Sequence, residues 1–334
     1  MKKIYLTLFV LTLLLNACDQ KPYKTIIAFG SCSHAFDSVQ MWDNIIAHNP
    51  SAWIWMGDNI YGDTEDMAIM KAKYDMQKER PSYQKLIKSM DIYGIWDDHD
   101  FGVNDGGKEY PMKDESKILM LDFLDVPANA TVRNQKGAYQ SYTISDKGLN
   151  IKLILLDTRY FRDSLEINLD RPPLYHPNMT GTVLGETQWN WLEKELTNSN
   201  ADIHLIGSSY QLIPNDHGYE KWGNFPNERK RFFSLISKTL PKRPIILSGD
   251  RHIAEFSKIK LEGLEYPLYE FTSSGLTHTW GTERPEENEH RIGEMIIKKN
   301  FGIIDIEHIN EDIQVKFYVY GSQNEVLYET IANF

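Results

Sequence analysis

The chain has 334 residues and a formal net charge of −11 at pH 7, with 41% hydrophobic and 25% charged residues. This length suits one large domain or two modest ones, and the composition is that of an ordinary globular protein. The acidic balance argues against nonspecific binding to nucleic acid, because phosphate backbones attract basic surfaces.

The N-terminus has the pattern of a bacterial signal peptide. Lys2 and Lys3 precede an apolar run over residues 4–15, which is shorter than the roughly 20 residues that cross a bilayer. The segment Leu15-Asn16-Ala17-Cys18 is similar to a lipobox, in which Cys18 becomes the lipidated first residue of the mature protein. The alternative is a plain signal peptide with an incidental cysteine.

We therefore predict a lipoprotein signal peptide over residues 1–17, a lipidated tether over 18–24 and one catalytic domain over 25–334. Such a protein would be anchored to a bacterial cell membrane on the periplasmic or cell-surface side, and its membrane contact would be through the lipid alone. Lipidation of Cys18 would leave Cys32 as an unpaired thiol, because the chain has only two cysteines. An unpaired thiol outside the cytoplasm is prone to oxidation unless it is buried or bound to metal.

Strands and helices alternate in the first three quarters of the chain. Buried apolar runs predict strands, and periodic amphipathic patterns predict helices. In chain order we expect a strand over 26–29, a helix over 39–47, a strand over 52–56, helices over 67–78 and 81–89, a strand over 92–96, a helix over 115–124, a hairpin of 139–144 with 149–156, a helix over 186–196, a strand over 203–206, a helix over 227–238 and a strand over 244–247.

The remaining segment is mostly strand, over 253–259, 268–272, 301–307, 313–320 and 326–330. Alternating elements followed by consecutive strands predict two packed sheets flanked by helices, because a single doubly wound sheet would keep the alternation to its end.

Polar residues able to bind metal follow four of the predicted strands. Loops at the carboxyl ends of strands form a crevice, and the strands hold the first loop residue rigidly. One Gly-Asp ending is also common turn chemistry, but four such endings favour a shared site. They are Cys32 with His34, Asp58 with Tyr61 and Asp63, Asp97-Asp98-His99-Asp100, and Asp250 with His252.

Cations would relieve the repulsion among so many carboxylates. Oxygen donors favour hard ions, whereas thiolate and imidazole favour a transition metal, so a mixed site is expected with Asp58 as the bridge. Alternatives stay open: Cys32 could be a small buried hydrophobe, Tyr61 a packing residue, and His34 either a ligand or a substrate contact. Asp97 is expected to contact the ligands without binding metal itself.

Five motifs follow one another along the chain: Gly30-Ser31-Cys32-Ser33, Gly57-Asp58-Asn59-Ile60-Tyr61-Gly62-Asp63, Trp96-Asp97-Asp98-His99-Asp100, Leu156-Asp157-Thr158-Arg159 and Ser248-Gly249-Asp250-Arg251-His252. In this order they resemble the PhoD-like alkaline phosphatase and phosphodiesterase family, within the calcineurin-like metallophosphatases. The resemblance implies a four-layer αββα sandwich of two mixed β-sheets flanked by helices.

The same resemblance implies a site of Fe³⁺ and Ca²⁺, with zinc or another divalent pair as the alternative. Cys32, Asp58, Tyr61 and either Asp250 or His252 would hold the iron. Asp58 would bridge to calcium, to which Asp98 and Asp250 would contribute. His99 falls where the family has its catalytic histidine.

Substrate contacts are expected from Arg159 and Arg251, which could bind phosphate oxygens in pairs, and from His34 and Trp222. The predicted reaction is hydrolysis of phosphomonoesters, phosphodiesters or both by a metal-bound hydroxide, with Asp58 and His99 as catalytic residues. Alternatives are a sulfatase acting on an extracellular polysaccharide and a non-catalytic surface binding lipoprotein. The sequence gives no indication of oligomeric state.

Overall fold

The computed structural model describes residues 23–37, 40–280, 286–309 and 312–334. The predicted signal peptide, Cys18 and most of the tether lie outside these ranges. The last two tether residues belong to the first strand, which begins at Tyr23. Among the described residues, no helix combines the length and the apolar character needed to cross a bilayer.

The first sheet has six strands in the order β15-β14-β13-β1-β2-β3. Its strands β1, β2 and β3 are parallel, while β13 pairs antiparallel with β1 and leads into the antiparallel strands β14 and β15. The bounds are β1 Tyr23–Gly30, β2 Ala52–Met56, β3 Asp91–Ile95, β13 Asn300–Ile309, β14 Asp312–Gly321 and β15 Val326–Ala332.

The second sheet has seven strands in the order β12-β10-β11-β9-β8-β5-β4. Strands β5, β8, β9 and β11 are parallel, and antiparallel strands complete both edges. The bounds are β4 Gln140–Asp146, β5 Leu149–Leu155, β8 Ile203–Gly207, β9 Pro244–Ser248, β10 Ala254–Ile259, β11 Leu268–Ser273 and β12 Arg291–Ile296; a separate small hairpin joins β6 Glu166–Ile167 to β7 Tyr175–His176.

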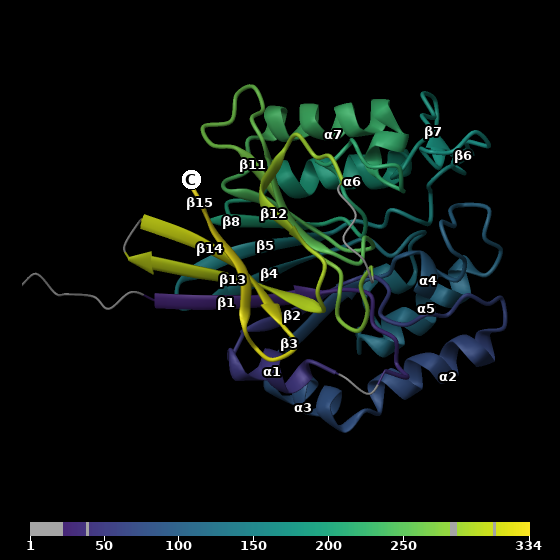
Figure 1. The fold of residues 1–334 in the computed structure, drawn as a ribbon, viewed down its shortest axis with the longest axis horizontal. Coiled ribbons are helices and arrows are strands. Elements are labelled where there is room, and N and C mark those ends of the chain that lie inside the picture. Colours follow the sequence, from purple (N-terminus) through teal and green to yellow (C-terminus); the bar gives the residue numbers. More distant parts are fainter. Residues whose placement is uncertain (1–22, 38–39, 281–285, 310–311) are drawn as a thin grey trace, which may run out of the picture.

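Helices cover the outer face of each sheet (Figure 1). Helices α6 and α7 lie over the second sheet, and α1 and α3 lie over the first. The helices are α1 Trp42–Ala47, α2 Met67–Lys78, α3 Pro81–Ser89, α4 Asp98–Phe101, α5 Lys113–Phe123, α6 Gly185–Thr197 and α7 Pro226–Thr239, with 3₁₀ turns η1 Thr131–Arg133 and η2 Trp222–Asn224.

Aromatic side chains fill the spaces between these layers. Between the sheets, Phe29 meets Phe271 edge to face with ring centroids 4.6 Å apart. On the opposite face of the first sheet, Trp55 packs against Trp42 of α1 at 5.2 Å and Tyr83 of α3 at 5.9 Å. The predicted four-layer αββα sandwich is therefore confirmed.

Most predicted elements lie where the sequence pattern places them, and α2 and α3 have the predicted bounds. Asp66 caps α2 by accepting from two backbone N–H groups, and Pro81 occupies the first turn of α3. Strand β12 was not predicted, because its residues are half-buried or exposed and lack a clear apolar alternation. Its pairing with β10 holds it in the sheet.

Candidate metal centre

The predicted ligands come from the carboxyl ends of strands in both sheets. Cys32 follows β1, Asp58 follows β2, and Asp98 opens α4 just after β3. Asp250 and His252 follow β9 of the second sheet. Because β1, β2 and β3 are parallel neighbours, their ends lie side by side, and the end of β9 approaches them from the other sheet.

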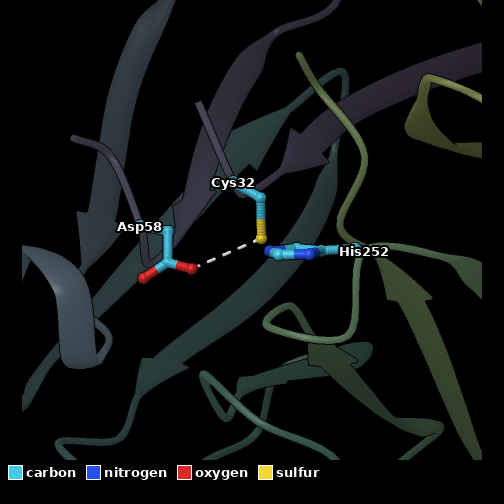
Figure 2. Close-up of side chains that lie close together, drawn as sticks. All are labelled: Cys32, Asp58 and His252. Carbon is cyan, nitrogen blue, oxygen red and sulfur yellow. Dashed lines mark hydrogen bonds between the residues drawn. The ribbon is translucent and has the colours of Figure 1, made fainter. Parts of the chain in front are cut away.

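Three of these side chains point toward one another in Figure 2: Cys32, Asp58 and His252. Their ligand atoms all lie within 4.8 Å of one another, and Cys32 Sγ lies 3.4 Å from Asp58 Oδ2. Three further groups meet the same limit: Asp58 with Asp98 and His99, Asp97 with Asp98 and Asp250, and Asp98 with Asp105 and Glu220. Asp58 belongs to two of these groups, as expected for a residue that joins neighbouring ion sites.

The backbone is unusual at four of the predicted ligands. The φ angles are 63° at Cys32, 48° at Asp58, 66° at Asp250 and 55° at His252. Residues with a Cβ rarely adopt this left-handed conformation. Such positions persist where the surrounding structure enforces them, and they concentrate at functional sites. Here they closely follow the strands, so these turns bring the candidate ligands close to one another.

The carboxylates of the site are buried, and the positive charge near them is too small to balance their negative charge. Burial, then repulsion from Asp98 and other carboxylates, raises the pKa of Asp58 well above its usual value. Burial also raises the pKa of Asp97 to about 8, although Arg159 opposes it, and Asp97 Oδ2 is buried without a hydrogen-bond partner. Bound cations would supply the missing charge. The thiol, phenol, imidazole and carboxylate donors therefore fit a metal centre.

Asp98 is the exception among these acids. Burial alone would raise the pKa of Asp98, but Arg159 and His99 outweigh it and lower the value to about 2. Its oxygens accept from the backbone N–H groups of His99 at 3.0 Å and Asp105 at 2.7 Å. This carboxylate is therefore held ionised and in a fixed orientation.

His99 borders the site with its ring fixed by a second carboxylate. Its Nδ1 lies 2.7 Å from Asp63 Oδ1, and both residues line a cavity of about 740 Å³. Burial would lower the pKa of His99, but the Asp63 hydrogen bond and the Asp98 charge outweigh it and raise the value to about 9. Asp63, which the sequence pattern places among the possible metal ligands, orients the imidazole here.

Tyr61 stands at the outer side of the centre among histidine rings. Its Oη lies 3.1 Å from His252 Nε2 and 2.9 Å from His278 Nε2, and the His34 ring stacks on it with centroids 3.9 Å apart. Burial and the neighbouring imidazoles lower the pKa of His278 to about 3. Sequence reasoning missed His278, although it follows the end of β11 as the other ligands follow their strands.

Arg159, which the sequence predicts to bind substrate, pairs with carboxylates of the protein in this structure, and its contact with substrate stays a prediction. The side chain is fully buried, and its guanidinium is occupied by two carboxylates. Nε donates to Asp97 Oδ1 at 2.6 Å, and Nη1 and Nη2 donate to Glu220 at 2.9 and 2.7 Å. The reason is long-range: Glu220 comes from a distant loop and takes the face of Arg159 that a phosphate would need.

Trp222 also departs from its predicted role in stacking on substrate. It is fully buried in the core beneath α6 and α7, packs near Trp189 and Phe232, and donates from Nε1 to Ser208 Oγ at 2.9 Å.

Arg251 is 2% exposed and pairs with Glu286 at 2.6 Å, while its Nε is buried without a hydrogen-bond partner. His34 remains beside the centre and lines a second cavity of about 270 Å³.

Known proteins resemble this chain in sequence pattern and in fold. The family model described as PhoD-like phosphatase matches residues 27–317. A solved structure of PhoD has a TM-score of 0.69 at 16% identity, covering 92% of this chain and 72% of that one. A dimetal phosphatase from Danio rerio has a TM-score of 0.58 at 12% identity, covering 93% and 99%. Comparison with curated proteins finds no match.

Proposed function

This chain belongs to the PhoD-like phosphatase family, and we propose that it is a metal-dependent phosphoesterase acting on phosphomonoesters, phosphodiesters or both. The observation that carries the proposal is the convergence of donors from four strand ends in three groups within 4.8 Å, the first two linked by Asp58 and the last two by Asp98. Neither a turn nor an ordinary core requires acids and a thiol to meet in this way.

We assign the ions to the donors by their chemistry. Cys32, Asp58, Tyr61 and His252 would hold a transition metal, because thiolate, phenolate and imidazole suit Fe³⁺. Asp58, Asp98 and Asp250 would hold a hard ion such as Ca²⁺, and a zinc or other divalent pair is the alternative. When bound, such ions neutralise charge on a phosphoryl group and activate water.

We assign to His99 the delivery of a proton to the leaving oxygen. Asp63 holds Nδ1 at 2.7 Å, which leaves Nε2 as the atom able to face a substrate. The ring borders the cavity of about 740 Å³, so a leaving group bound there would lie beside it. A proton supplied at that oxygen assists departure, which is the usual contribution of a general acid.

The membrane anchor is a separate proposal that rests on the sequence pattern of residues 1–18. Lipidation of Cys18 would retain the mature protein on the membrane fraction of a bacterial host. Substitution of Cys18→Ser should move the protein to the soluble fraction and leave its intact mass without acyl chains. An unmodified N-terminal mass for the wild-type chain would contradict the anchor.

Turnover of three aryl esters tests the proposed activity. An aryl phosphate, a bis-aryl phosphate and an aryl sulfate are compared with protein of known metal content, and one or both phosphate esters should be cleaved faster than the sulfate. Faster cleavage of the sulfate would replace the proposal with a sulfatase. A protein without turnover at any metal loading would support a binding role.

The substitution that tests the metal centre is Asp58→Asn, which keeps the size of the side chain and removes its negative charge. It should lose bound metal and lower kcat by at least about 100-fold. Asp43→Asn is its control, because Asp43 is exposed and pairs with Lys85 across the surface at 3.1 Å. The control should retain both metal and turnover.

A further inference from the structure

His278 completes a triangle of donor atoms with two of the proposed ligands. Tyr61 Oη, His252 Nε2 and His278 Nε2 are separated by 3.1, 2.9 and 3.2 Å. Two ligands at about 2.1 Å from one ion and about 95° apart lie roughly 3.1 Å from each other. The three separations therefore match the edges of a coordination sphere.

The contacts of Thr277 favour one tautomer of His278. We assign the single hydrogen of the Thr277 hydroxyl to the carbonyl oxygen of Cys32 at 3.1 Å, because a carbonyl oxygen can only accept, and the hydroxyl then accepts from His278 Nδ1 at 3.1 Å. It also accepts from the backbone N–H of His34 at 2.8 Å. With this assignment His278 carries its hydrogen on Nδ1, and the lone pair of Nε2 points to Tyr61 and His252.

Hydrogen bonds alone do not satisfy this triangle. Tyr61 Oη and His252 Nε2 can each supply one hydrogen, and His278 Nε2 supplies none, so one of the three contacts lacks a hydrogen. A single cation can accept all three lone pairs at once. A histidine that ligates metal commonly donates its other ring N–H to a protein oxygen, as His278 does to Thr277.

We propose that His278 is a further ligand of the ion held by Tyr61 and His252. This rests on the proposed metal-dependent function. Cys32 and Asp58 form a compact group with His252 that does not include His278, so His278 enters from the outer side of the centre. Thr277 links this ligand to the Cys32 loop through the backbone carbonyl of Cys32.

Metal affinity tests the proposal without relying on turnover. Full-length wild type, His278→Ala and His278→Gln are stripped of metal and titrated with Zn²⁺ against a chromophoric chelator. Loss of the imidazole should weaken Zn²⁺ binding by roughly 10- to 100-fold or more. His278→Gly should regain affinity when free imidazole is added. The control is His48→Ala, since His48 bonds Asn324 at 2.7 Å at the other end of β2.

The visible spectrum of the Co²⁺-loaded protein separates a ligand from a residue that only supports Tyr61. Removing a nitrogen donor should change the band positions in His278→Ala, and imidazole should restore them in His278→Gly. Unchanged Zn²⁺ affinity and an unchanged Co²⁺ spectrum in a folded His278→Ala protein would overturn the role of His278 while leaving the metal centre intact. A wild type that binds no metal would overturn both proposals.

Discussion

The variant Arg159→Ala tests whether this arginine stabilises the fold by pairing with buried carboxylates or instead contacts a phosphate of the substrate, as the sequence predicts. In the structure the guanidinium lies between Asp97 and Glu220, and all three side chains are almost fully buried. In the sequence, Arg159 lies about sixty residues from Asp97 and about sixty from Glu220. Removing Arg159 would leave the buried Asp97 without its cation, whereas Glu220 would keep Arg162 at 3.3 Å.

The expected cost follows from this burial. Breaking a buried ion pair from one side costs about 3–5 kcal/mol, because the remaining charge is desolvated and unpaired. Arg159 lowers the pKa of Asp97 against the effect of burial, so the pKa should rise further in the variant, and protonation of Asp97 limits the cost to this range. A loss of that size corresponds to a fall in Tm of roughly 5–8 °C for a domain of about 300 residues.

Urea unfolding of the metal-free proteins measures the change, and steady-state kinetics of the metal-loaded proteins measures KM. The control is Arg231→Ala, whose guanidinium is 40% exposed and pairs with the exposed Glu186. A surface pair of this kind contributes about 1 kcal/mol or less. If Arg159→Ala unfolds like the wild type and only KM rises, the arginine contacts substrate and the structural reading is wrong.

Three further outcomes follow from the site. Asp63→Asn should lower kcat by roughly 10-fold for an alkyl phosphate and by less for p-nitrophenyl phosphate, because a good leaving group needs less help from His99. Equal losses on both substrates would contradict the role of His99 as proton donor to the leaving oxygen. Chelation of the bound ions should abolish turnover and lower Tm, since ions that bind only the native state stabilise it; a chelated enzyme with full activity would refute the metal requirement. Trp222→Ala should cost about 3–5 kcal/mol in unfolding free energy and leave KM unchanged, because the ring is buried in the core. A raised KM in a stable variant would restore its substrate role.

The sequence by itself predicted the elements and the points where the ligands emerge. Strands such as β2 and β9 are buried on both faces, so they appear as unbroken apolar runs that end at Asp58 and Asp250. Helices α2 and α3 have their own capping signals. These features depend on residues close together in the chain, which is why local patterns are sufficient to find them.

Only the tertiary structure decided what surrounds those ligands. Arg159 and Trp222 carry the same local chemistry whether they face a substrate or the core, and long-range partners put them in the interior. His278 has no motif of its own, and its Nε2 meets Tyr61 Oη across 217 residues of sequence separation. Burial and partners at such distances depend on how the two sheets pack, and that information is not contained in any local stretch of sequence.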